Sequence, residues 1–214
     1  MIKRTFAAAA LLLVSTGALA QSNSFLSSLY VAGTLGYAQS NIDTGGISQQ
    51  VQDLGFKNVN TSSDDGQFAW RITGGWQPLK NLAFEVSYFD LGKPGYTVTA
   101  TQAGALDASI KVSGWSLDLV PQYDFNDQWG IFGRAGFAWS ESKASFNGTG
   151  NFELLQSSVK ETNNGWDAGV GVSYRFNKNF SLRAEWTYYP DLGGEAMGGN
   201  FNANLYSLSA VWRF

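Results

Sequence analysis

The sequence contains no cysteine and no histidine among its 214 residues. The absence of cysteine excludes disulfide bonds and thiolate metal sites. The absence of histidine excludes a Ser-His catalytic dyad, and the serines and carboxylates that remain form no recognisable nucleophile and base arrangement. We therefore expect no enzymatic activity, no metal site and no bound cofactor.

Long apolar runs are also missing. After Ala20 no uninterrupted apolar stretch reaches the roughly eighteen residues that a membrane-spanning helix requires. The first residues are different, because Lys3 and Arg4 precede a short apolar segment and small residues follow it up to Ala20. This order is typical of a cleaved secretory signal, so we expect a signal peptide at 1–20 and one mature domain at 21–214.

Charge of either sign is scarce, at 14% of the residues. Once Lys3 and Arg4 are set aside, 12 basic residues stand against 17 acidic ones, which gives a formal net charge of −5. A nucleic-acid-binding domain typically carries a basic surface. We therefore expect no nucleic acid among the partners.

Glycine and aromatic residues are abundant, with 25 glycines and 15% aromatic residues. After residue 27 apolar residues recur at every second position, which is the period of a β-strand and not of a helix. Eight segments show this alternation: 29–38, 68–77, 82–89, 115–125, 129–139, 167–176, 180–189 and 204–214. The pattern predicts an all-β fold of eight antiparallel strands in up-and-down order.

The connections between these segments alternate in length. Short ones at 78–81, 126–127 and 177–179 contain residues that favour hairpin turns. Long polar connections occupy 39–66, 92–109, 141–164 and 191–202. Short turns at one end and long loops at the other are typical of an outer-membrane barrel, which has periplasmic turns and extracellular loops.

The volume available inside a barrel decides which face of each strand points inward. One face carries Trp, Tyr, Phe and Leu, and the other carries mainly Gly, Ala, Ser and a few charges. An eight-stranded barrel has just enough interior room for side chains, so the aromatic face would overfill it and must point outward. A soluble barrel would need the opposite arrangement. The outward belt, with aromatics near both strand ends, therefore predicts a closed transmembrane β-barrel.

Several short motifs occur in a characteristic order between about Leu29 and Phe214. They are AFEVSYFDLGK after GGWQ, IFGRAG after a short turn, GVGVSY, LRAEW and the terminal SLSAVWRF. In this order and spacing the sequence resembles the transmembrane domain of OmpA-type outer-membrane proteins. The resemblance implies a barrel-only member without the periplasmic peptidoglycan-binding domain. It also implies export through the Sec pathway to the outer membrane of a Gram-negative cell.

Charged residues on the inward face form the candidate site. They are Arg71, Glu85, Asp118, Arg134, Arg183 and Glu185. Buried charges are costly unless they pair, so we expect these groups to pair with one another in the lumen. By resemblance, Glu85 and Arg183 match the ion pair that closes the family's pore, with Arg134 and Glu185 in the same network.

Two readings of this charged lumen stay open: a plug that stiffens the barrel, or a gate on a narrow water path. The positions that match the family's alternative ion-pair partners hold Val120 and Ser173, which disfavours a gate that works by exchange of partners. The inward Phe89 and Phe132 would narrow any path. We expect a structural or surface role in the cell envelope with small, rare conductance at most. The alternatives are a small porin-like channel and an adhesin that acts through its loops.

The last strand carries three outward aromatic residues, Tyr206, Trp212 and Phe214. By resemblance to outer-membrane proteins generally, a terminal aromatic residue is a signal for the barrel-assembly machinery. The expected partners are thus this machinery during biogenesis and, afterwards, outer-membrane lipid and lipopolysaccharide. We expect the protein to be a monomer.

Overall fold

A computed structural model describes residues 27–41, 60–64, 66–100, 104–148, 157–194 and 199–214. The expected signal peptide lies outside the described residues. The strands are β1 (Leu29–Asn41), β2 (Asn60–Asp64), β3 (Gly66–Leu79), β4 (Leu82–Asp90), β5 (Gly95–Ala100), β6 (Gly104–Asp124), β7 (Trp129–Gly148), β8 (Ser157–Arg175), β9 (Phe180–Gly194) and β10 (Gly199–Arg213). Within these ranges no helix is long and apolar enough to cross a membrane.

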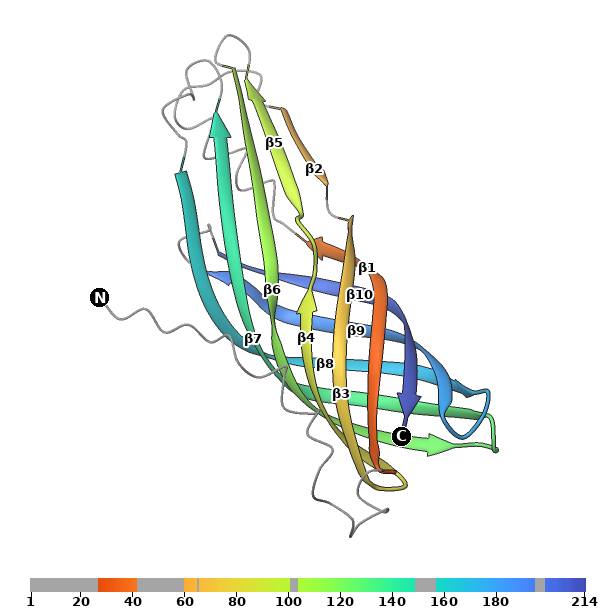
Figure 1. Ribbon diagram of the computed structural model, residues 1–214. Helices are drawn as coiled ribbons and strands as arrows, with labels where there is room; N and C mark the ends of the chain where they lie inside the picture. Colours follow the sequence, from red (N-terminus) through yellow and green to blue (C-terminus); the bar gives the residue numbers. More distant parts are fainter. Residues whose placement is uncertain (1–26, 42–59, 65, 101–103, 149–156, 195–198) are drawn as a thin grey trace, which may run out of the picture.

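Eight of the strands close into an antiparallel barrel (Figure 1). The pairing order is β1, β3, β4, β6, β7, β8, β9, β10, and β10 returns to β1 along a register that runs from Tyr30↔Arg213 to Asn41↔Asn202. Beyond this register the backbone N–H of Phe214 donates to the carbonyl oxygen of Leu29 at 3.2 Å. Closure leaves no open strand edge in the barrel wall, as lipid requires. The predicted fold class is confirmed.

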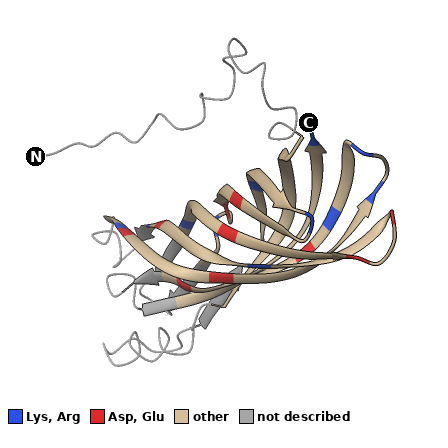
Figure 2. Cartoon of the chain, turned by 90° about the horizontal axis from the view of Figure 1, so that it is seen from below, with Lys and Arg blue, Asp and Glu red and all other residues tan. Residues whose placement is uncertain are grey.

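Side chains alternate between the lumen and the outer surface, as the sequence pattern predicts. In β1, for example, Tyr30, Ala32 and Thr34 are buried, whereas Val31 and Leu35 are exposed. Large apolar side chains remain exposed around the whole barrel, and Phe68, Phe137 and Leu208 each expose 65% of their surface. Most of each strand is free of charge (Figure 2). Such a surface suits lipid and is unsuited to water.

Aromatic side chains form two girdles around this surface. At the loop end, Tyr88 contacts Trp70 and Trp115, with ring centroids 5.5 and 5.0 Å apart. At the turn end, Tyr174 contacts Trp129 with a centroid distance of 4.8 Å. Trp129 and Trp139 belong to opposite girdles of β7 and are ten positions apart, which corresponds to about 25 Å along the barrel axis for a strand tilted by about 40°. This height matches the apolar band of an outer-membrane barrel.

The tight turns at the periplasmic end use asparagine in the same way twice. Asn126 Oδ1 accepts hydrogen bonds from the backbone N–H groups of Gln128 and Trp129, at 2.9 and 2.8 Å. Asn177 Oδ1 accepts from Asn179 and Phe180, both at 2.9 Å. An asparagine side chain that binds the backbone two or three residues ahead fixes a turn locally. These two hairpins therefore form where the sequence places them.

At the opposite end the strands continue far into segments that the sequence analysis assigns to loops. The β6–β7 register extends to Leu106↔Gly148, and the β7–β8 register to Phe146↔Ser157. Two further strands bring the sheet to ten: β5 pairs antiparallel with β6, and β2 pairs antiparallel with β5. The expectation of structureless long loops is therefore wrong for these segments. Beyond the membrane the outward face need not be apolar, so the sequence signal of a strand weakens while backbone pairing continues.

Candidate functional site in the barrel lumen

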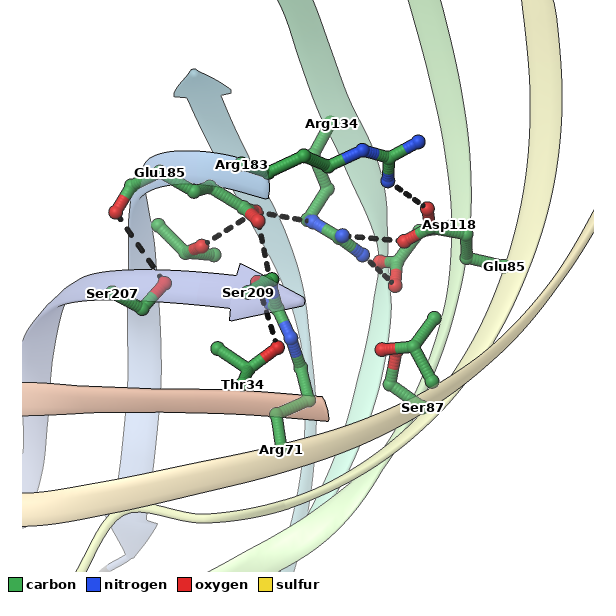
Figure 3. A network of polar contacts seen from close by, with 12 residues as sticks. Thr34, Arg71, Glu85, Ser87, Asp118, Arg134, Arg183, Glu185, Ser207 and Ser209 are labelled. Atoms are coloured by element: carbon green, nitrogen blue, oxygen red, sulfur yellow. Dashed lines mark hydrogen bonds and ion pairs between the residues drawn. The ribbon is translucent and has the colours of Figure 1, made fainter. Parts of the chain in front are cut away.

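The structure brings the six charged residues predicted from the sequence together inside the barrel (Figure 3). They come from β3, β4, β6, β7 and β9, and their side chains are almost completely buried. Strand alternation turns each of them inward, and the barrel's curvature lets them meet. We call these six side chains together the ionic layer.

Arg134 is the centre of the ionic layer. Its Nε donates to Glu185 Oε1 at 2.6 Å, its Nη1 to Asp118 Oδ2 at 2.6 Å, and its Nη2 to Glu85 Oε2 at 2.5 Å. One guanidinium thus binds carboxylates from three other strands. A planar guanidinium with fixed donor directions suits such a junction, whereas the ammonium of lysine would not.

Glu85 is the second junction. Besides Arg134, its carboxylate accepts from Arg183 Nη1 at 2.7 Å and from the hydroxyl group of Tyr30. The Arg183 guanidinium also lies over the rings of Tyr30 and Phe132, 5.2 and 5.0 Å from their centroids. Arg183 is therefore held by both a carboxylate and two aromatic faces. Tyr30 has inward parity in β1, but parity alone does not show its hydrogen bond to Glu85.

Glu185 connects the ionic layer to β3. Its Oε2 accepts from Arg71 Nη2 at 2.6 Å, and its Oε1 accepts from the Thr187 hydroxyl at 2.9 Å in addition to Arg134. Arg71 is 1% exposed, and its Nε and Nη1 atoms have no partner among the described residues. The three arginines and three glutamate or aspartate residues balance in charge, which makes burial of the whole set tolerable.

A fourth buried acidic side chain, Asp167 of β8, lies beside this balanced set. It is 1% exposed, and neither of its carboxylate oxygens has a hydrogen-bond donor within the described part of the chain. Asp167 and Asp118 flank the same glycine, Gly136, in the strand register, and Asp118 Oδ1 also has no donor. The sequence analysis misses Asp167 as a site residue. Its inward direction could have been predicted, because Asp167 has the same parity in β8 as the inward Gly169.

We expect Asp167→Asn to stabilise the barrel. The amide has no charge to bury and can donate to the unpaired Asp118 oxygen, a gain of ~1–2 kcal/mol in the free energy of unfolding. Urea unfolding in detergent micelles measures it. Asp127→Asn, at an exposed turn, is the control and should leave the midpoint unchanged. A lower midpoint for Asp167→Asn would show that the carboxylate is needed where it is.

Apolar side chains fill the lumen on both sides of the ionic layer. The upper apolar layer, on the loop side, is a buried cluster that includes Phe89, Tyr189 and Leu205. The lower apolar layer, on the turn side, includes Tyr30, Phe132 and Val211. The sequence analysis predicts inward Phe89 and Phe132 but not two layers. The ionic layer thus lies between two clusters of buried apolar side chains.

The outward aromatics of β10 lie along the seam where the barrel closes. Tyr206 is opposite Tyr37 and Trp212 is opposite Val31 in the β1 register. Trp212 and Phe214 expose 51% and 58% of their surface on the lipid side. Their positions near the short turns place them in the periplasmic girdle, whereas Tyr206 lies toward the loop end.

No group of three or more His, Cys, Asp and Glu residues with a geometry suited to a metal ion occurs in the described ranges. The ionic layer has carboxylates, but each of its six members is paired with another member. Its chemistry is that of charge pairing among buried side chains.

Comparison with known proteins agrees with this architecture. The family model for the outer membrane protein beta-barrel domain matches residues 6–214. The chain belongs to this outer-membrane barrel family. It is an envelope protein of the Gram-negative outer membrane, and its lipid-facing belt contacts membrane lipid.

Curated relatives include the outer membrane protein A of Serratia marcescens, 27% identical over 216 residues, which cover 100% of this chain and 56% of the relative. An uncharacterized protein of Haemophilus influenzae is 30% identical over 151 residues, which cover 66% of this chain and 81% of that protein. The chain spans about half the length of the outer membrane protein A relatives from Serratia marcescens and Klebsiella pneumoniae, 56% and 50%.

Solved structures show the same fold. Neisserial surface protein A superposes with a TM-score of 0.54 at 18% identity and covers 87% of this chain and 97% of its own. The outer membrane protein OprG from Pseudomonas aeruginosa gives 0.53 at 14% identity, with 87% and 95% covered.

Proposed function

We propose that the protein is a structural barrel of the cell envelope whose lumen is closed and conducts rarely, if at all. The observation that carries this proposal is the order of layers in the lumen: apolar, ionic, apolar. Ions would have to pass two dehydrated layers and break buried ion pairs, and each step is costly. A small barrel packed with side chains acts as a rigid body in the membrane.

The swelling of liposomes that contain the full protein in sugar solutions tests this function. We expect swelling no faster than in protein-free liposomes, because neither water columns nor solutes cross the packed lumen. Rapid swelling with small sugars would contradict the proposal and favour the porin-like channel. The protein must first pass a folding check, which is the gel-mobility shift between unheated and heated samples.

A second candidate function is recognition at the cell surface. The supporting observation is the sheet of β2, β5, β6, β7 and β8 beyond the loop-end girdle, since binding residues concentrate on parts held by a rigid scaffold. Replacement of residues 144–159 by a two-residue turn would shorten β7 and β8 and keep the barrel. Lost cell or matrix binding with an unchanged gel shift would support this role, and unchanged binding would oppose it.

The route to the membrane is part of the proposal. Export through the Sec pathway would end with cleavage before Gln21, which the intact mass of the protein from outer membranes checks. Tyr206, Trp212 and Phe214 would then be read by the barrel-assembly machinery, and the inserted barrel would be a monomer. A mass of the detergent-solubilised protein that corresponds to more than one chain would contradict the monomer.

Deletion of Phe214 is expected to reduce insertion in cells far more than folding in vitro. The residue contributes one backbone hydrogen bond and one exposed ring, so its loss costs the finished barrel little, about 1 kcal/mol. The fraction inserted is measured by the gel shift of outer-membrane samples and of refolded protein. Phe176→Ala, another exposed ring at the turn end, is the control. Equal losses in both samples would indicate a stability effect in place of a signal.

A further inference from the structure

Three lysines lie side by side on neighbouring strands just beyond the loop-end girdle. Lys111 of β6 is opposite Lys143 of β7, and Lys143 is opposite Lys160 of β8. All three side chains are exposed, and each has the outward parity of its strand. We call them the lysine row.

The level of the lysine row follows from the girdle beneath it. Trp115 and Trp139 are opposite each other in the same register, four positions below Lys111 and Lys143, which corresponds to roughly 10 Å along the barrel axis. Interfacial aromatics mark the border between hydrocarbon and headgroups. The flexible lysine stem can carry the ammonium back toward that border. The lysine row therefore lies at the level of the outer-leaflet headgroups.

The charges of the row are only partly compensated by the protein. Like charges directly opposite each other on paired strands destabilise a sheet. Asp90 binds Lys111 at 3.1 Å and raises its pKa through this hydrogen bond and charge, and Glu141 binds Lys160 at 2.6 Å. The Lys143 side chain, between the other two, has no ion pair or hydrogen bond in the part of the chain that the structure describes. The centre of the row is a cation without a counter-ion.

We propose that the lysine row binds the phosphate groups of a phosphorylated glycolipid in the outer leaflet. Two strand spacings separate Lys111 from Lys160, roughly 10 Å, a span that one or two phosphates on a disaccharide headgroup can bridge. Each phosphate oxygen accepts from ammonium donors and relieves the repulsion within the row. Asp90 and Glu141 orient the outer two lysines from the membrane side. The inference does not depend on whether the lumen conducts.

Nanodiscs of neutral phospholipid, with and without diphosphorylated lipid A, provide the test with the full protein. We expect lipid A to raise the unfolding temperature of the wild type by several degrees and to remain bound in native mass spectrometry. Lys143→Gln should lose most of this shift and of the bound lipid. The same variant breaks no ion pair of the described residues and removes the repulsion within the row, so in neutral lipid it should unfold at the temperature of the wild type or slightly above it.

A matched control is Lys178→Gln, an exposed lysine in the turn between β8 and β9 on the periplasmic side. It should keep the full lipid A shift. Dephosphorylated lipid A and inorganic phosphate in solution should give no shift with the wild type. The proposal is overturned if Lys143→Gln keeps the shift, if free phosphate reproduces it, or if phosphatidylglycerol is equally effective, since that would indicate a general attraction to anionic lipid.

Discussion

Arg134→Gln is expected to destabilise the folded barrel by ~3–5 kcal/mol, the cost of breaking a buried ion pair by removing one partner. Arg134 donates to Glu85, Asp118 and Glu185 at once. Glutamine removes the positive charge and can replace only part of these hydrogen bonds. Three carboxylates would then share two remaining arginines in a layer of buried side chains. The free energy of unfolding in urea, with the barrel in detergent micelles, measures the loss.

Arg175→Gln is the control for this expectation. Arg175 pairs with Asp124 at 3.2 Å near the turn end, and its side chain is 33% exposed. Half-exposed pairs contribute little, so its loss should stay below about 1 kcal/mol. The double variant Glu85→Gln with Arg134→Gln should cost less than the two single changes added together, because it removes an unpaired charge. Similar losses for Arg134→Gln and Arg175→Gln would show that the ionic layer does not hold the barrel together.

Opening the lumen is expected to require substitutions in two layers. Arg183→Ala removes one partner of Glu85 and the cation between Tyr30 and Phe132. It should increase the frequency of small current steps in planar bilayers without producing a stable pore, because the upper apolar layer stays packed. Addition of Phe89→Ala and Tyr189→Ala, whose rings lie 5.1 Å apart in that layer, should give long-lived openings.

The matched control for conductance keeps Arg183 and carries only Phe89→Ala and Tyr189→Ala. With the ionic layer intact, this variant should remain as silent as the wild type. Each variant must show the gel shift of a folded barrel before its current is recorded. Large, steady current steps in the wild type would refute the closed lumen, and stable pores in Arg183→Ala alone would assign closure to the ionic layer.

The barrel itself could be predicted because its physics is local. Period-two alternation, the small interior volume and the short turns are each visible in single segments, such as residues 129–139 with their inward Arg134. The inward position of Glu85 or Asp118 follows from parity alone. Which carboxylate binds which arginine does not follow from parity. Only Asp118 and Arg134 come from neighbouring strands, β6 and β7, and the other ion pairs join strands that are not neighbours and meet across the lumen. For this reason the sequence does not predict that Arg134, and not Arg183, is the centre of the ionic layer.

Two features could not be predicted for other reasons. The strands beyond the girdle, including β2 and β5, carry too few apolar residues in alternation to be recognised from the sequence. The parity of Asp167 predicts that it points inward, but not what surrounds it. Its strand neighbour Gly136 leaves room for the Asp118 carboxylate, because a Cβ at Gly136 would lie 2.2 Å from Asp118 Oδ1. A missing side chain on one strand thus sets the surroundings of two carboxylates on the strands beside it.

The ionic layer also constrains the order of events during biogenesis. Arg183 is 98 positions from Glu85 along the chain, and Glu185 is 114 from Arg71. Until β9 has joined the wall, Glu85 and Arg71 lack these partners, and an open sheet of fewer strands would expose them to hydrocarbon. Insertion and closure should therefore be one cooperative step. Pulse proteolysis during folding into liposomes would then find only unfolded and complete barrels, with no stable half-inserted species between them.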